Sequence, residues 1–196
     1  MLKIFSTAQV MRADAYTIEN EPISSNNLME RAAKACVDWL TNFPDFHSKQ
    51  ILVFCGPGNN GGDGLAIARM LSQLQPGVHV YIPDEDEKVS LDFTINFERI
   101  IGTQIHVQTH EAFDPASVAD EILVIDALFG SGLTKPLDGK YKELVERINN
   151  SSGITIAIDI PSGIYADKSQ DLQNVSVIKA DYTLSFEFPK LAFLQP

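Results

Sequence analysis

Six short, mostly apolar runs constrain this chain more than any other feature. They lie at 51–55, 78–82, 105–107, 122–125, 154–158 and 182–186. A strand that is apolar on both faces needs a layer of structure on each side of its sheet, as strands of parallel sheets do. The runs therefore predict a parallel sheet that is covered on both faces.

Segments with helical character lie before and between these runs. Ser6 and Gln9 fit a capping box that opens a helix over 7–18, and a 3.6-residue apolar rhythm predicts a second helix over 25–43. Further helices are expected at 64–74, at 90–101, briefly after 114 and at 137–149. Such alternation implies right-handed βαβ crossovers. We expect one α/β domain over residues 1–196, a Rossmann-like three-layer α/β/α sandwich with a mostly parallel sheet.

The net charge of the chain excludes some classes of binding partner. Fifteen Lys and Arg against 26 Asp and Glu give a formal net charge of −11, which repels phosphate backbones and anionic lipid surfaces. We therefore expect no nucleic-acid partner. No apolar stretch approaches about eighteen residues, so no membrane segment is expected either. Cys36 and Cys55 lack metal-binding spacing and are interpreted as reduced core residues of a cytoplasmic protein.

A glycine-rich segment follows the first apolar run and precedes a helix. Gly56, Gly58 and Gly61 have the GxGxxG spacing of dinucleotide-binding loops, which is weak evidence by itself. Glycines let a backbone approach a ligand and adopt positive φ, and the N–H groups of a helix start bind phosphate. The alternative is a tight turn in which Asp63 caps the helix, but that leaves the adjacent pair of asparagines unexplained.

Two aspartates stand in equivalent places after the fourth and fifth apolar runs. Asp126 precedes a loop with two glycines, and Asp159 precedes a tight turn that contains Ser162. Ligands of open α/β sheets bind beyond the carboxyl ends of the strands, so these residues and the glycine-rich segment are expected to share a cleft. Partial burial there suits an acid/base group. Carboxylate, amide and hydroxyl oxygens without His or Cys favour a hard cation over zinc or iron, although each aspartate alone could be a cap or turn former.

Three segments together resemble a known family. They read Gly-Pro-Gly-Asn-Asn-Gly-Gly-Asp-Gly at 56–64, Asp-Ala-Leu-Phe-Gly-Ser-Gly-Leu at 126–133 and Asp-Ile-Pro-Ser-Gly at 159–163. In this order and spacing they resemble the YjeF N-terminal domain, the NAD(P)H-hydrate epimerase family. Ser-Thr-Ala-Gln at 6–9 with Asp14, Leu-Met-Glu-Arg-Ala-Ala at 28–33, Lys-Ala-Asp at 179–181 and Pro-Lys at 189–190 also agree.

The resemblance implies an isomerase that interconverts the R and S epimers of NADHX and NADPHX, which are hydrated at C6 of the dihydronicotinamide ring. It implies substrate binding by Asn59, Asn60, Gly61, Gly62, Asp63, Gly130, Ser131, Gly132, Leu133, Thr134, Lys135, Pro136 and Asp159. It also implies a potassium ion (K+) held by Asn60, Asp126 and Ser162. Asp126 is the expected catalytic acid/base. Lys88 stands where some members carry a catalytic lysine, and its alternative is a surface lysine after an acidic run.

The expected reaction needs an acid/base group and a cleft for a flat ring. Protonation of the C6 hydroxyl lets water leave while the ring nitrogen supplies electrons, and addition of water to the other face inverts the carbon. Asp126 is expected to transfer the proton. Ring opening at N1 is an alternative route, and the sequence does not choose between them.

The chain departs from the family pattern in two places. Ala33 replaces the usual glycine after Met-Glu-Arg-Ala, and the chain ends at Pro196, where family domains continue into another strand. We therefore interpret the domain as truncated at its C-terminal end. The resemblance implies fusion to an ADP- or ATP-dependent NAD(P)H-hydrate dehydratase domain and a homodimer as further expectations.

Two other functions remain as alternatives. An NAD-dependent dehydrogenase needs an acidic ribose-binding residue about 20 positions after the glycine loop, whereas Asp84 comes late and the four histidines lie outside the three segments. A non-enzymatic module that binds a nucleotide or a protein would use the same cleft without chemistry. Acceleration of NADHX epimerisation separates the enzyme from both.

Overall fold

The computed structural model describes residues 3–84, 86–118, 122–171 and 175–194. In this part of the chain six strands form one sheet in the order β3-β2-β1-β4-β5-β6, and every neighbouring pair is parallel. The strands are β1 (Ile51–Cys55), β2 (Val78–Ile82), β3 (His106–Thr109), β4 (Leu123–Ala127), β5 (Ile154–Ile158) and β6 (Tyr182–Leu184). Because the chain winds outward from β1 in one direction and from β4 in the other, the strand order switches between them.

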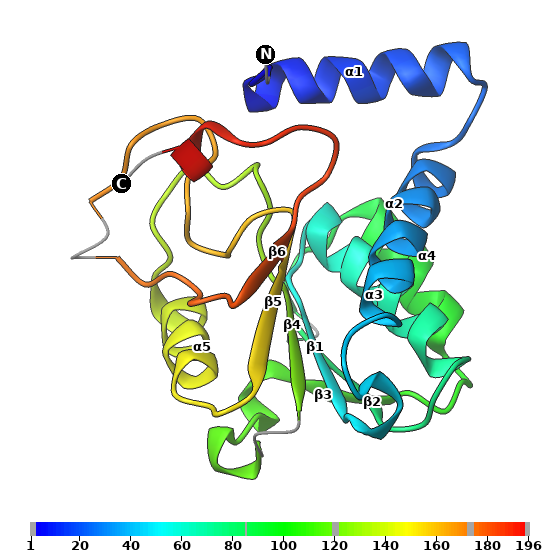
Figure 1. Cartoon of the computed structure of the whole chain (residues 1–196), viewed down its shortest axis with the longest axis vertical. Helices are drawn as coiled ribbons and strands as arrows, with labels where there is room; N and C mark the ends of the chain where they lie inside the picture. Colours follow the sequence, from blue (N-terminus) through cyan, green and yellow to red (C-terminus); the bar gives the residue numbers. More distant parts are fainter. Residues whose placement is uncertain (1–2, 85, 119–121, 172–174, 195–196) are drawn as a thin grey trace.

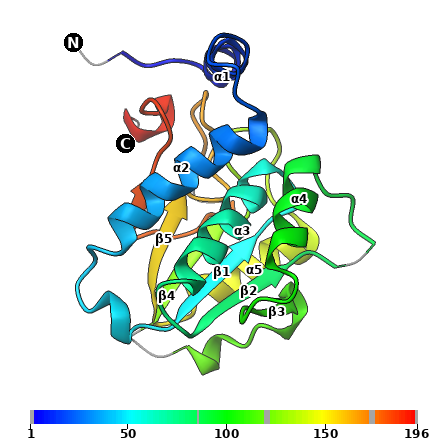
Figure 2. The same cartoon turned by 90° about the vertical axis from the view of Figure 1, so that its right-hand side faces the viewer.

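Helices cover both faces of the sheet (Figure 1). They are α1 (Thr7–Asn20), α2 (Ser25–Leu40), α3 (Asn59–Ser72), α4 (Leu91–Ile100) and α5 (Gly139–Asn149). Figures 1 and 2 show α2, α3 and α4 on one face and α5 on the other, with α1 set apart from both. The expected Rossmann-like three-layer α/β/α fold is thus confirmed, with a sheet that is wholly parallel in the described residues.

The side chains of β1 explain why an unbroken apolar run is needed in the centre of the sheet. Ile51, Val53 and Cys55 join the core beneath α2 and α3, whereas Leu52 and Phe54 join the core beneath α5. All five are buried. Successive strand residues point to opposite faces, so a polar residue at any of them would enter one of two cores.

Several predicted boundaries shift in the structure. The capping box at Ser6 is present, with Ser6 N donating to Gln9 Oε1 at 2.9 Å. Helix α3 begins at Asn59, five positions before the expected start at Gly64, so most of the glycine-rich segment is helix rather than turn. Strand β4 continues to Ala127, which places Asp126 inside the strand. Strand β6 ends at 184 and α2 at 40, both earlier than predicted, and the short helix after 114 is a 3₁₀ turn.

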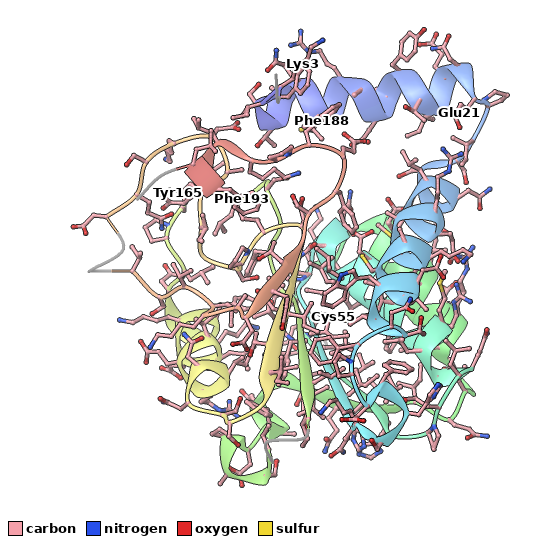
Figure 3. The ribbon with its side chains drawn as sticks, viewed as in Figure 1. Lys3, Glu21, Cys55, Tyr165, Phe188 and Phe193 are labelled. Atoms are coloured by element: carbon pink, nitrogen blue, oxygen red, sulfur yellow. The ribbon has the colours of Figure 1, made fainter. Side chains whose placement is uncertain are left out.

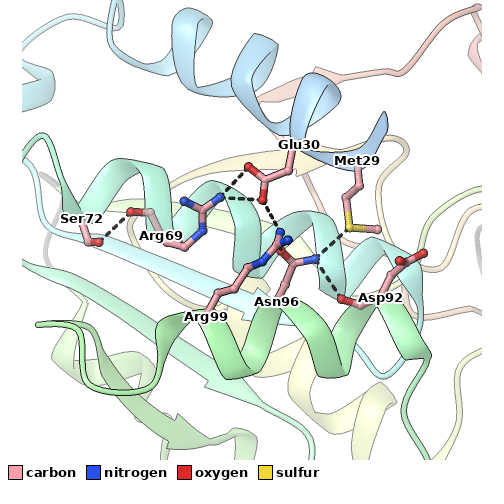
Figure 4. Close-up of polar contacts among 7 residues, drawn as sticks. All are labelled: Met29, Glu30, Arg69, Ser72, Asp92, Asn96 and Arg99. Atoms are coloured by element: carbon pink, nitrogen blue, oxygen red, sulfur yellow. Dashed lines mark hydrogen bonds and ion pairs between the residues drawn. The ribbon is translucent and has the colours of Figure 1, made fainter. Parts of the chain in front are cut away.

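An ion-pair cluster ties the three helices on one face together (Figure 4). Glu30 of α2 accepts from Arg69 of α3 at 2.6 Å and from Arg99 of α4 at 2.7 Å. The carboxylate and the Arg69 guanidinium are partly shielded from water, which strengthens their pairing relative to exposed pairs. This cluster fixes α3, whose first turn lies at the carboxyl end of β1.

The acidic run at 84–87 does not behave as the solvated loop that its composition favours. Position 85 lies outside the described residues. Asp84 and Glu87 both pair with Lys140 of α5, at 2.9 and 2.6 Å, and Glu87 also accepts from Tyr141 at 2.8 Å. The run therefore connects the segment after β2 to the start of α5.

Helix α1 is attached by a few polar and ring contacts rather than by a buried face. None of its residues is buried. Thr7 N donates to Asp167 at 2.8 Å, Thr7 Oγ1 donates to the Ser131 carbonyl at 3.3 Å, and the Phe5 ring lies 4.4 Å from that of Phe188. Figure 3 shows Phe188 in the C-terminal segment that runs beneath the helix. The helix thus lies over the carboxyl ends of the strands.

Two further expectations concern the described residues. Cys36 and Cys55 are free and buried, as predicted. No helix in the described ranges has both the length and the apolar character that crossing a bilayer requires.

The buried His110 makes folding stability depend on pH. Its Nε2 lies 2.9 Å from the Cys55 carbonyl oxygen, and burial lowers its pKa from 6.5 to about 4. The folded form then holds the neutral ring, so its stability is complete above pH 6.5 and declines as the pH falls towards 4. Denaturant titrations should show that His110→Gln removes up to about 3 kcal/mol of the stability difference between neutral pH and pH 4. Equal pH slopes in the two proteins would contradict this assignment.

Candidate active site

Close backbone packing at the switch point explains two glycines of the glycine-rich segment. Gly56 N donates to the Ala127 carbonyl at 2.9 Å. A Cβ on Gly56 would overlap the Leu128 carbonyl, and a Cβ on Gly61 would overlap the Gly56 carbonyl. No glycine of this segment has a positive φ, contrary to our expectation. Close approach, rather than an unusual backbone conformation, is what requires these glycines.

Asp126 is sealed at the end of β4. Its side chain is fully buried. Oδ1 accepts from Ser162 Oγ at 2.6 Å and from Leu128 N at 3.1 Å, while Oδ2 accepts from Ser162 N at 2.8 Å. Burial raises the pKa of this carboxyl to about 6, and the hydrogen bonds from Ser162 and Leu128 oppose the rise. The carboxylate is therefore held firmly but lies behind the adjacent loop.

Ser162 joins the loops that follow β4 and β5. Besides its contacts with Asp126, its Oγ accepts from Phe129 N at 2.8 Å. The residue is fully buried. One hydroxyl thus fixes the β4 loop where it turns toward the predicted substrate-binding residues.

Asp159 connects three parts of the chain. Its backbone has φ 68°, which marks the expected tight turn. Oδ2 accepts from Ser131 N at 2.8 Å, and Oδ1 pairs with Lys190 Nζ at 2.9 Å. Lys190 is buried and also donates to the Phe186 carbonyl at 2.9 Å. Sequence reasoning noted Lys190 only as part of the family resemblance and gave it no role.

Asn60 lies beside Asp159 and the β4 loop. A Cβ on Gly130 would lie 2.9 Å from Asp159 Oδ2 and 3.4 Å from Asn60 Oδ1. Asn60 is 8% exposed, and its Nδ2 has no hydrogen-bond partner among the described residues. The three segments singled out in the sequence therefore meet at one place, and a buried amide there has room for a ligand atom.

A cavity of about 590 Å³ opens at this meeting point. Of the predicted substrate-binding residues, those that line it are Asn59, Asn60, Asp63, Gly130, Ser131, Gly132, Leu133, Thr134, Lys135 and Asp159. Gly61, Gly62 and Pro136 do not line it. Neither do Asp126 and Ser162, which lie beneath it, nor Lys88, which is exposed. The structure thus gathers most of this set, while the role of each residue stays a prediction.

A second cavity of about 570 Å³ adjoins the first. Asp14, Asn59, Asp63 and Phe186 line both, so the two form one continuous hollow. The second is acidic, with Asp92 and Glu187 also on its wall. Asp14 and Glu187 share a hydrogen bond, and burial and this bond raise the pKa of Glu187 to about 7.

Residues from the two ends of the chain were not predicted for this hollow. Asp14 and Met11 come from α1, and Phe186 and Glu187 follow β6. Of the residues from α1 that line the hollow, Asp14 and Thr7 carried a signal, as part of the resemblance. The ends approach the strands through tertiary contacts that local sequence patterns do not reveal.

The three predicted potassium ligands all carry oxygen atoms and lie around the loop after β4. Asp126 and Ser162 are in direct contact, and Asn60 lies across the β4 loop at Gly130. The Nδ2 of Asn60 is buried without a hydrogen-bond partner in the described residues, and the Asp126 carboxylate supplies a single negative charge. Such a set suits a hard monovalent cation, and within the described ranges no three His, Cys, Asp or Glu residues are placed to hold a metal.

Substitution by alanine should affect stability differently at Gly58 and at Gly61. Gly61→Ala places a methyl group against the Gly56 carbonyl, whereas a Cβ on Gly58 meets nothing within 4 Å. We expect Gly61→Ala to lower the free energy of unfolding by about 3 kcal/mol or more, and Gly58→Ala to leave it nearly unchanged. Denaturant unfolding of both variants measures this. Equal stabilities would show that the close packing is not maintained in solution.

Comparisons with known proteins agree with this arrangement. The family model described as YjeF-related protein N-terminus matches residues 25–192. The NAD(P)H-hydrate epimerase of Limosilactobacillus fermentum is 39% identical over 190 residues, which cover 94% of this chain and 86% of that protein. The NAD(P)H-hydrate epimerase of Oenococcus oeni is 35% identical over 189 residues, with coverage of 96% and 87%.

A longer relative and a solved structure extend the comparison. The bifunctional NAD(P)H-hydrate repair enzyme Nnr of Thermofilum pendens is 34% identical over 197 residues; the match covers 98% of this chain but 37% of that protein. The crystal structure of yeast ynu0, YNL200c, shares the fold with a TM-score of 0.83 at 24% identity, covering 98% of this chain and 84% of that one. With its three segments gathered at one hollow, and with the family model matched from residue 25 to residue 192, the chain belongs to the family of YjeF-related N-terminal domains.

Proposed function

We propose that this protein is an NAD(P)H-hydrate epimerase, an isomerase that interconverts the R and S epimers of NADHX and NADPHX. The observation that carries the proposal is the meeting of the three segments at one hollow beyond the switch between β1 and β4. Open α/β sheets bind nucleotides at this place. Relatives that share 35% and 39% of its residues over most of both chains bear the name NAD(P)H-hydrate epimerase.

The wall of the larger cavity suits the phosphates of such a substrate. The first turn of α3 presents backbone N–H groups at Asn59 and Asn60, where a helix start attracts anions. Lys135 adds a cation on the same wall, within the segment from Gly130 that we propose to bind substrate. The helix start and Lys135 thus make this part of the wall favourable for an anion although the chain as a whole is negatively charged.

The chemistry needs proton transfer to and from the C6 hydroxyl. Asp126 is the residue that the sequence indicates for this step. In the structure its carboxylate does not line the cavity, and all its contacts go to Ser162 and Leu128. The most direct effect of these hydrogen bonds is to hold the loops after β4 and β5 in fixed positions relative to each other. Lys88 stays a prediction, with an exposed side chain away from the cavity wall.

We propose K+ as the ion held by Asn60, Asp126 and Ser162. When bound, it supplies a fixed positive charge beneath the β4 loop. The loop itself presents Ser131 N to Asp159 and places Gly130 on the cavity wall. The residues would thus set the shape of the substrate wall.

Assembly and location follow as parts of the same proposal. The relative from Thermofilum pendens is bifunctional, which supports fusion of such a domain to an NAD(P)H-hydrate dehydratase. A homodimer would use the exposed side chains of α1, of which Met11 and Tyr16 are the large apolar ones. We place the protein in the cytoplasm because both cysteines are free.

A dehydrogenase is disfavoured by particular side chains. Asp84, its candidate ribose ligand, pairs with Lys140 instead, and no histidine lines the larger cavity. A binding module without chemistry would not accelerate the epimerisation of NADHX beyond its rate in buffer. A rate measurement therefore distinguishes it from the enzyme.

The central test follows the approach of R-NADHX to its epimer mixture. The purified protein should accelerate this approach, and Asp126→Asn should reduce kcat/KM by at least about 100-fold. An amide has one acceptor oxygen and cannot satisfy the donors that now bond both carboxylate oxygens, so the two loops would lose their fixed positions. Chromatographic separation of the epimers gives the rates, and circular dichroism confirms that the variant is folded. A rate with the wild-type protein no faster than in buffer would refute the proposed activity.

Potassium should also stabilise the protein measurably. At constant ionic strength, replacing tetramethylammonium by K+ is expected to raise the melting temperature, because a ligand of the folded state shifts unfolding. The rise should be absent in Asp126→Asn and in Ser162→Ala. A rise of the same size in both variants would place the ion elsewhere.

A further inference from the structure

Asp63 is a carboxyl that the fold does not explain. It lies in the second turn of α3, which is capped at Gly58, so it is not the helix cap that its position suggested as an alternative. It makes no hydrogen bond or ion pair within the described residues, although it is half-buried. A carboxyl without a partner costs stability where water is scarce, so its presence here calls for a functional reason.

Other carboxyl groups face Asp63, and each of them has a partner. Asp159 pairs with Lys190, Asp92 accepts from Ser25 Oγ at 2.9 Å, and Asp14 shares a hydrogen bond with Glu187. The Cys36 thiol of α2 also lies near Asp63. Burial and the charges of Asp159, Asp92 and Asp14 raise the pKa of Asp63 well above its usual range.

Asp63 opens onto both halves of the hollow. Asn60 stands three positions earlier on α3, and residues so spaced lie on the same side of a helix. Asn60 lines the larger cavity with a side chain more than nine-tenths buried, and its Nδ2 has no hydrogen-bond partner in the part of the chain that the structure describes. The two side chains together indicate that a polar ligand occupies the hollow between them.

The acidic surroundings of Asp63 do not form a metal centre, since the described residues contain no group of three suitable ligands. They suit a ligand that becomes cationic. Loss of the C6 hydroxyl from NADHX leaves a positive charge on the ring, and carboxylates around it stabilise that charge.

We propose that Asp63 is the catalytic residue that gives its proton to the C6 hydroxyl of the substrate, with Asp126 as a positioning residue beneath the site. The proposal rests on the epimerase function above. It goes beyond substrate binding, which is the role that the resemblance implies for Asp63. It also assigns the proton donation to a carboxyl that lines the cavity, Asp63, instead of the fully buried Asp126.

The protons and electrons of this step balance. The Asp63 carboxylic acid protonates the hydroxyl, the C6–O bond breaks with its electron pair, and water leaves. The N1 lone pair forms the C6–N1 double bond, so a carboxylate faces a cationic ring. Water then adds to the other face of C6 and the N1 lone pair is restored. The added water gives its excess proton to a carboxylate of the same cluster, from which it returns to Asp63 and restores the acid. No oxidant or reductant is required.

The test compares Asp63→Asn with Glu98→Gln in the full chain. Glu98 is exposed on α4, lines neither cavity and controls for the loss of one acid. With R-NADHX, Asp63→Asn should lower kcat by at least about 100-fold while KM and the affinity for the probe ADP-ribose change little, since only the proton donor is lost. Glu98→Gln should match the wild type. The melting temperature of Asp63→Asn should equal or exceed that of the wild type, because a repelled carboxyl is removed.

The outcomes separate this proposal from the one on which it rests. An inactive wild-type protein contradicts the epimerase function itself. An active wild type with Asp63→Asn within about threefold of its kcat overturns the role of Asp63 and leaves the function standing. If Asp63→Asn fails to fold, Asp63→Ser provides the second variant. Unfolding of both contradicts the proposal, because it would show that Asp63 serves the fold.

Discussion

The hydrogen bonds between Asp126 and Ser162 are the constraint on which the site depends. They join the carboxyl ends of two central strands through a carboxylate that three donors satisfy, at 2.6, 2.8 and 3.1 Å. Without those donors a fully buried carboxyl would be costly. Because the Ser162 hydroxyl also accepts from Phe129 N, the same contact sets the course of the loop toward Asp159. One buried polar group thus determines where the walls of the hollow lie.

Around this contact, close backbone packing positions α3, and charged side chains set the electrostatic character of the hollow. The first turn of α3 fits against β1 and the β4 loop only because Gly56 and Gly61 have no side chains. Asp92 and Glu187 line only the second cavity, and Lys135 lines only the larger one. A substrate with an anionic pyrophosphate and a ring that becomes cationic matches this polarity, which a purely apolar cleft would not provide.

The sequence predicted the sheet well because mostly apolar runs are typical of strands that are buried on both faces. It placed the start of α3 too late, since Asn and Gly have low helix propensity and the packing of Gly61 against Gly56, which favours the helix there, is tertiary. It ended the fourth strand before Asp126 because a charged residue is normally excluded from such a strand, and the donors from Ser162 come from 36 residues away. The motifs located the cavity, but Lys190 and Glu187 could not be assigned, because their partners Asp159 and Asp14 are set by long-range packing.

The loose attachment of α1 bears on how this domain can be handled. The helix contributes Thr7, Met11 and Asp14 to the hollow, yet it precedes the region from residue 25 that the family model matches. Trimming an expression clone to the matched region would leave both hydrophobic cores intact, because none of their residues belongs to α1. Such a product would keep its core residues while one side of its ligand chamber stood open to solvent.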